Sequence, residues 1–93
     1  MKTIYISKLI SDQISLGESV KKINGNVPYK EREQILNDFN SNIISEIVVS
    51  YNLVITGGVR YVKNGHDIKI KFTGDFTEED KEKLNKRIQY NIR

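Results

Sequence analysis

The residues from Ile43 to Phe72 show the clearest alternation of apolar and polar positions in the chain. Large apolar side chains occupy every second position from Ile47 to Ile55, and polar side chains such as Ser50 and Asn52 fall between them. A period of two is typical of a strand that buries one face in a core. Shorter alternations at 59–62 and 68–73 repeat the pattern, so this stretch is predicted to contain three strands.

Two glycine-containing turns are expected to join these strands. Asn64-Gly65 is a strong hairpin signal, because a type I′ turn needs positive φ at both central residues. Gly57-Gly58 marks the other turn, where a bulged or three-residue loop keeps the apolar faces in register. The three strands are therefore predicted to form an antiparallel meander.

The N-terminal half is expected to add one strand and two helices. Residues 2–10 alternate in part, which indicates a strand that pairs with the meander. The sequence Ser15-Leu16-Gly17-Glu18 has the spacing of a capping box, and Asn24-Gly25 would close the short helix that begins there. A second helix is predicted to start around Pro28 and to end at the Asn40-Ser41-Asn42 cluster.

A third helix is predicted after Thr77. The Thr77 hydroxyl can cap it, and Glu78, Glu79 and Asp80 occupy the first turn, where the helix dipole favours negative charge. The whole chain is thus predicted to be a single α+β domain over 1–93, in the order β-α-α-β-β-β-α. One antiparallel sheet would carry all the helices on one face. Its expected core is Leu36, Phe39, Tyr51, Leu53, Ile70, Phe72, Leu84 and Ile88.

Length and composition constrain the number of domains, the cellular compartment and the origin of the protein more than its function. A length of 93 residues suits one domain with one modest core, and the absence of cysteine excludes disulfides and thiolate metal sites. No continuous apolar run resembles a signal peptide or a membrane span. A cytoplasmic protein without membrane contact is therefore expected. Abundant Ile, Lys and Asn, with no Ala or Trp, are typical of low-GC bacteria and their phages.

Catalytic chemistry finds little support in the sequence. His66 is the single histidine, and the neighbouring Asp67 cannot orient it on a strand because adjacent residues point to opposite faces. The acidic residues Glu78, Glu79 and Asp80 are explained by the helix dipole rather than by a metal. The sequence therefore predicts no catalytic residue, no metal and no cofactor, and the protein is expected not to be an enzyme.

The second face of the meander is the predicted binding surface. It combines cations with apolar side chains, and Arg60 is expected opposite Lys69, where two like charges repel each other unless an anionic partner relieves them. The alternative is a solvated face with long cationic side chains in water. The predicted partner-binding residues are Val48, Asn52, Val54, Arg60, Val62, Lys69 and Lys71.

Two functional hypotheses follow from this surface. The preferred one is a small accessory or regulatory protein, of inhibitor or adaptor type, that binds a protein or ribonucleoprotein partner. The alternative is a nucleic-acid binding module that uses the same cations. A net charge of +3 is modest for a nucleic-acid binder. Tyr51 and Tyr61 are also expected in the core rather than free to stack on bases.

Overall fold

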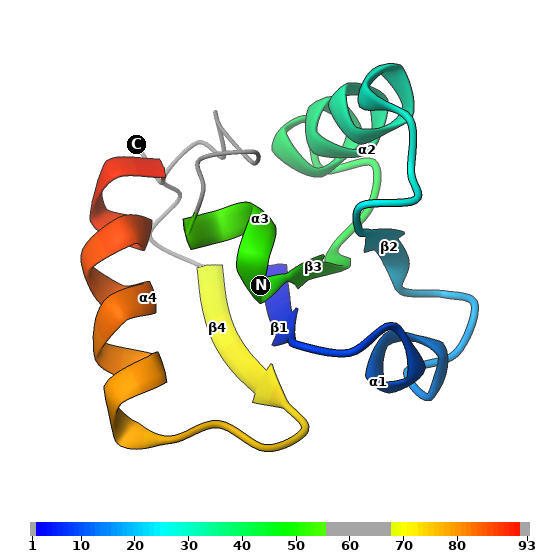
Figure 1. Cartoon of the computed structure of the whole chain (residues 1–93). Coiled ribbons are helices and arrows are strands. Elements are labelled where there is room, and N and C mark those ends of the chain that lie inside the picture. Colours follow the sequence, from blue (N-terminus) through cyan, green and yellow to red (C-terminus); the bar gives the residue numbers. More distant parts are fainter. Residues whose placement is uncertain (1, 56–67, 92–93) are drawn as a thin grey trace.

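The computed structural model describes residues 2–55 and 68–91, and strands and helices alternate along this part of the chain (Figure 1). The elements are β1 (Lys2–Ser7), α1 (Ile10–Ile14), β2 (Lys21–Ile23), α2 (Tyr29–Asn40), β3 (Glu46–Ser50), α3 (Tyr51–Ile55), β4 (Ile68–Thr73) and α4 (Glu78–Asn91). Three predictions lie outside these described residues: the Asn64-Gly65 hairpin, the Gly57-Gly58 turn and the strand at 59–62.

The four described strands form one sheet in the order β2-β3-β1-β4, and every pairing in it is parallel. The prediction of mixed helix and strand content is confirmed, but the predicted antiparallel sheet and the predicted order β-α-α-β-β-β-α are wrong. Residues 8–20 join β1 to β2, and residues 24–45 join β2 to β3. Connections of a dozen or more residues allow a chain to return and pair in parallel.

Strand β1 lies at the centre of the pairing, between β3 and β4. Ile4 is in register with Ile47 on one side and with Ile70 on the other. Side chains in register share a face of the sheet, and alternate residues along each strand point the opposite way. The sheet therefore has one face built from Ile4, Ile6 and their neighbours, and a second face that carries Thr3 and Tyr5.

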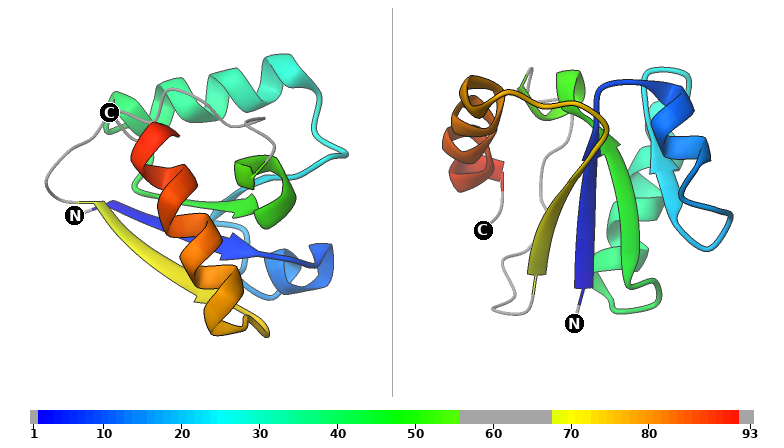
Figure 2. Two further views of the ribbon diagram at one scale, coloured as in Figure 1. Left: turned by 60° about the vertical axis from the view of Figure 1, so that its left-hand side comes forward. Right: turned by 90° about the horizontal axis from the view of Figure 1, so that it is seen from below.

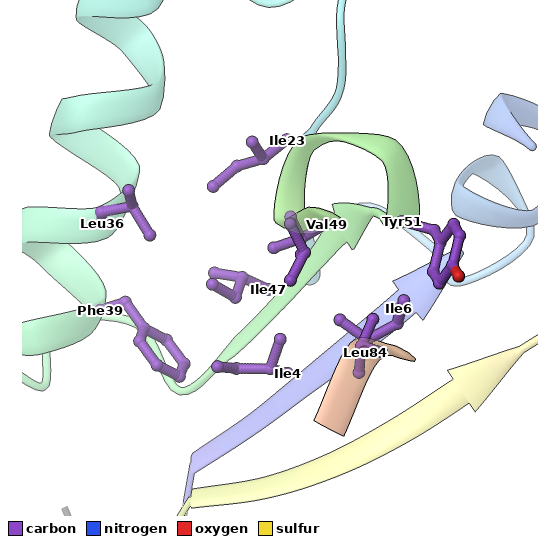
Figure 3. Packing of buried hydrophobic residues seen from close by; sticks show 10 residues of the cluster. Ile4, Ile6, Ile23, Leu36, Phe39, Ile47, Val49, Tyr51 and Leu84 are labelled. Atoms are coloured by element: carbon purple, nitrogen blue, oxygen red, sulfur yellow. The ribbon is translucent and has the colours of Figure 1, made fainter. Parts of the chain in front are cut away.

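The core lies on the Ile4 face, between the sheet and three helices. Leu36 and Phe39 from α2, Tyr51 from α3 and Leu84 from α4 are buried against Ile4 and the strands beside it (Figure 3). These four residues were predicted core members. Leu53, Ile70 and Phe72, also predicted, pack against the same cluster while partly buried. The core position predicted for the Ile88 side chain lies outside the described side chains.

Helix α1 packs on the other face of the sheet. Its buried Gln13 donates hydrogen bonds to the Ser50 hydroxyl and to the Ile23 carbonyl, over 3.2 and 3.1 Å, and Ser50 is on the same face as Thr3 and Tyr5. The prediction that all helices share one face is therefore wrong for α1. Figure 2 shows α1 beside the ends of the central strands, away from α4.

The predicted strand at 47–55 is replaced by a strand and a short helix. β3 ends at Ser50, and α3 begins at the next residue. Ile47, Val48 and Val49 are all buried, which is typical of a central strand in a parallel sheet with both faces covered at that point. In α3, Tyr51 and Val54 are both buried, and residues three apart share a face of a helix.

The predicted helix at 15–24 is also wrong. Helix α1 ends at Ile14, and the Ser15 hydroxyl donates to the Asp12 carbonyl behind it rather than capping a new helix. Ile23 is fully buried in β2. Gly25 does not have positive φ, whereas Gly17 does, at 81°, so the tight turn falls earlier than predicted.

The ends of the two long helices agree with the sequence signals. α2 begins at Tyr29, directly after Pro28, and ends at Asn40. Asn42 has the left-handed φ of 62° that closes it. At the start of α4 the Asp80 amide donates to the Thr77 hydroxyl over 3.1 Å, which confirms the predicted cap. Neither helix, nor any other in residues 2–55 and 68–91, is long and apolar enough to cross a membrane.

Candidate partner-binding site

The clearest candidate site is the sheet face opposite the core, where β4 and β1 meet. Lys69 and Lys71 are exposed and alternate with the half-buried Ile68 and Ile70. Parallel pairing places Lys69 beside Thr3 and Lys71 beside Tyr5. We call the surface formed by Thr3, Tyr5, Glu46, Lys69 and Lys71 the lysine face.

Strand β3 also contributes to this surface, because it pairs with the other edge of β1. Glu46 is in register with Thr3, so Lys69, Thr3 and Glu46 form one line across three strands. Tyr5 and Glu46 are both half-buried. The Lys71 ammonium lies 6.0 Å from the centroid of the Tyr5 ring, which is the outer limit of a cation–π contact. Aromatic and charged groups thus lie side by side here.

The lysine face is the part of this sheet side that α1 leaves uncovered among the described residues. α1 lies toward β2 and β3, where Val48 is fully buried. The right-hand view of Figure 2 shows β4, β1 and β3 from this side, with α1 near their ends. Parallel sheets are normally covered on both faces. An open area on such a sheet is therefore a place where a partner can pack.

The lysines near this face differ in the contacts that their ammonium groups make. Lys22 is in register with Val48, but its ammonium donates to the carbonyls of Gly17 and Val20, over 2.5 and 2.9 Å. Lys69 and Lys71 make no ion pair with a carboxylate within the described ranges. These two ammonium groups are therefore the ones presented to an anionic partner.

The predicted site residues are distributed over several parts of the structure. Lys69 and Lys71 lie together on the exposed face, as predicted. Val48 is 0% exposed, and Val54, on α3, is 5% exposed in the core, so neither offers a contact surface. Asn52 is exposed on α3, on the core side of the sheet. Arg60 and Val62, with the expected pairing of Arg60 and Lys69, lie outside the described residues.

Sequence reasoning missed Thr3, Tyr5 and Glu46. The signal for the first two was present, because Thr3 and Tyr5 alternate with Ile4 and Ile6 and so point away from the core. Nothing local to Glu46 shows that β3 pairs with β1. Only the register of the parallel sheet brings Thr3 and Tyr5 beside the two lysines and places Glu46 on the same face, one strand further.

A second polar group of residues lies at the carboxyl ends of the strands. Gln13, Asn24 and Ser50 are linked through the Gln13 side chain, and Gln13 and Asn24 are buried. The nearby Ser7 hydroxyl is buried with no hydrogen-bond partner in the described structure. These side chains are amides and hydroxyls that do not titrate near neutral pH, so they provide no acid or base. We interpret the group as a structural link between α1, β2 and β3.

A third group of residues is charged: Lys8 and Asp80 join the end of β1 to the start of α4. The two side chains form an ion pair, and the Lys8 ammonium lies 5.1 Å from the centroid of the Phe76 ring. The hydrogen bond from Lys8, with that from the Thr77 amide, lowers the pKa of Asp80 to about 2. Burial raises the pKa of the Tyr51 hydroxyl, which the Asp80 carboxylate also raises. The charges are mutually satisfied, which is the arrangement of a structural contact.

Metal and histidine chemistry receive no support from the described residues. Residues 2–55 and 68–91 hold no cluster of three His, Cys, Asp or Glu side chains that could ligate a metal. His66 lies outside the described residues.

Comparison of the chain with protein-family models, with curated proteins and with solved structures gave no match.

Proposed function

We propose that this protein is a small non-enzymatic accessory protein that binds an acidic surface of a protein or ribonucleoprotein partner through the lysine face. The observation that carries the proposal is the position of Lys69 and Lys71. Both are exposed on a part of the parallel sheet that no described helix covers, and Lys71 is in register with the half-buried Tyr5. Complementary charge speeds encounter and fixes register, while an aromatic side chain at the centre supplies buried contact area.

Exposed apolar residues on the same side of the sheet favour a protein partner. Leu9, Ile10 and Ile14 are 61%, 45% and 67% exposed. Ile10 and Ile14 are four residues apart on α1, so they are neighbours on its surface. Apolar groups near a cationic face suit a protein surface, because exposed apolar patches commonly mark protein interaction sites.

Nucleic acid is the second candidate, and one observation favours it. Tyr5, on a sheet face that no described helix covers, lies beside Lys71 and has the combination of aromatic ring and cation that single-stranded nucleic acids use. Against it, Tyr51 is buried in the core, as predicted, and the two exposed lysines that β4 contributes to this face in the described residues are few for a phosphate backbone. The experiment below separates the two partners.

The test is affinity capture from a lysate of a low-GC bacterium, with and without nuclease. The bait is the parent chain, the Lys69→Glu/Lys71→Glu variant, or a Lys30→Glu/Lys86→Glu control with the same change in net charge at exposed helix positions. We expect the parent and the control to retain the same protein after nuclease treatment, and the β4 variant to lose it. Circular dichroism should show all three folded.

Two results would contradict the proposal. Equal capture by the parent and by the Lys69→Glu/Lys71→Glu variant would show that the lysine face is not the contact. Loss of all capture after nuclease, with a steep fall of affinity as salt rises, would indicate nucleic acid, because phosphate neutralisation releases counterions.

A further inference from the structure

The charges of the lysine face are arranged with opposite signs on opposite sides of β1. Lys69 and Lys71 project from β4, and Glu46 projects from β3 on the far side of β1. Two strand spacings separate Lys69 from Glu46, which corresponds to about 9–10 Å between their backbones. Among the described residues that β1, β3 and β4 direct to this face, Glu46 is the acidic one.

We infer that Glu46 determines the specificity and the orientation of the partner, an inference that rests on the proposed function. A matching protein surface carries carboxylates over Lys69 and Lys71 and a cationic side chain over Glu46. The half-buried position of Glu46 makes its charge costly to leave unpaired once a partner excludes water. Glu46 thus selects against a uniformly acidic surface.

The same residue separates a mixed-charge protein surface from a polyanion. A surface with both signs loses an attraction when Glu46 is neutralised. A nucleic acid or a purely acidic peptide loses a repulsion instead. The change produced by Glu46→Gln therefore has opposite signs for the two kinds of partner.

The probes are two labelled synthetic peptides and an oligothymidylate. The mixed peptide has the sequence Glu-Thr-Glu-Gly-Gly-Lys, and the acidic peptide has Glu in place of its Lys. In an extended peptide the two Glu residues of Glu-Thr-Glu are about 6–7 Å apart, which is also the spacing of Lys69 and Lys71 along β4. Each Glu can therefore face one lysine. Each probe is titrated at up to millimolar concentration into the isotopically labelled full chain, and amide chemical shifts on β1, β3 and β4 are followed.

We expect the parent chain to bind the mixed peptide about three- to tenfold more tightly than the acidic peptide, since one partly exposed charge pair and one relieved repulsion account for roughly that ratio. Glu46→Gln should weaken the mixed peptide, strengthen the acidic peptide and the oligothymidylate, and so remove the preference. Glu33→Gln is the matched control, because Glu33 is an exposed carboxylate on α2.

The outcomes distinguish this inference from the proposed function. If both peptides bind in a manner that depends on Lys69 and Lys71, but Glu46→Gln leaves their ratio unchanged, the role of Glu46 is refuted and the proposed function stands. If the oligothymidylate binds more tightly than either peptide, or if no probe shows binding that depends on the two lysines, both are refuted.

Discussion

The side-chain amide of Asn24 donates a hydrogen bond to the side-chain oxygen of Gln13 over 2.9 Å, and both side chains are buried. Gln13 in turn donates to the Ile23 carbonyl and to the Ser50 hydroxyl. One glutamine from a five-residue helix therefore connects α1 to the ends of β2 and β3. Buried polar groups of this kind stabilise a structure only when all their partners remain in place.

Gln13→Leu should destabilise the protein by about 2–3 kcal/mol, because it leaves buried partners without their hydrogen bonds while keeping the side-chain volume similar. Urea unfolding followed by circular dichroism measures the free energy of unfolding. The control is Gln34→Leu on α2, where the amide donates to Asp38 at the exposed surface, and its cost should stay below about 0.5 kcal/mol. Equal losses in the two variants would show that the buried network contributes nothing specific.

Phe39 is expected to be the most sensitive position of α2. Its side chain is fully buried between the helix and the Ile4 face of the sheet, so Phe39→Ala should cost about 3–5 kcal/mol in unfolding free energy. Tyr29→Ala is the control on the same helix, since Tyr29 is 64% exposed. A loss below about 1 kcal/mol for Phe39→Ala would mean that α2 does not cover the sheet.

Gly74 follows β4 in a conformation that other residues rarely adopt, with φ of 91°. A Cβ atom at this position would also collide with the Asp12 carboxylate. The colliding atoms are the end of the Asp12 side chain, which can rotate away. Gly74→Ala should therefore cost roughly the 1–2 kcal/mol of a left-handed residue, as measured by urea unfolding.

Two companion variants separate the causes at Gly74. Asp12→Ala combined with Gly74→Ala removes the collision and should recover little of the lost stability, because the backbone strain remains. Gly25→Ala, where the surroundings are open and φ is not left-handed, should change stability by less than about 0.5 kcal/mol. A Gly74→Ala variant as stable as the Gly25→Ala variant would contradict the described turn.

The ion pair of Lys8 and Asp80 predicts a specific response to acid. The pKa of Asp80 in the folded protein, about 2, is below its ordinary value of 3.8. The contribution of Asp80 is therefore fully present above about pH 4 and is lost as the pH falls through 2. Lys8→Ala should raise the pKa of Asp80, which NMR titration of the carboxyl carbon measures directly. The same pKa in the parent and in Lys8→Ala would show that Lys8 is not the cause.

Stability measurements give an independent check on Asp80. Asp80→Asn should remove this part of the dependence of unfolding free energy on pH between about 4 and 2. Glu79→Gln provides the control, because Glu79 pairs with Lys83 on the exposed side of α4, at 3.6 Å, and exposed pairs contribute little.

Local signals in the sequence were enough to predict several elements of this fold. The cap at Thr77 and the start and end signals of α2, which are Pro28 and the Asn40-Ser41-Asn42 cluster, depend on neighbouring side chains and backbone. The sequence alone therefore located both long helices. The alternation from Ile68 to Phe72 also determined that Lys69 and Lys71 point away from the core. These properties depend on residues a few positions apart.

The tertiary structure decided which strands pair and in which direction. Every residue offers the same backbone hydrogen-bonding groups, so the alternation at Ile47 and Ile70 cannot specify a partner strand. The run Ile47-Val48-Val49 is typical of a strand buried on both faces, but the alternation from Ile47 to Ile55 led to the prediction of a strand with one buried face. Tyr5 and Glu46 share a sheet face with the two lysines only because the crossovers place β1 between β3 and β4. That arrangement depends on the packing of the whole core, which no local segment contains.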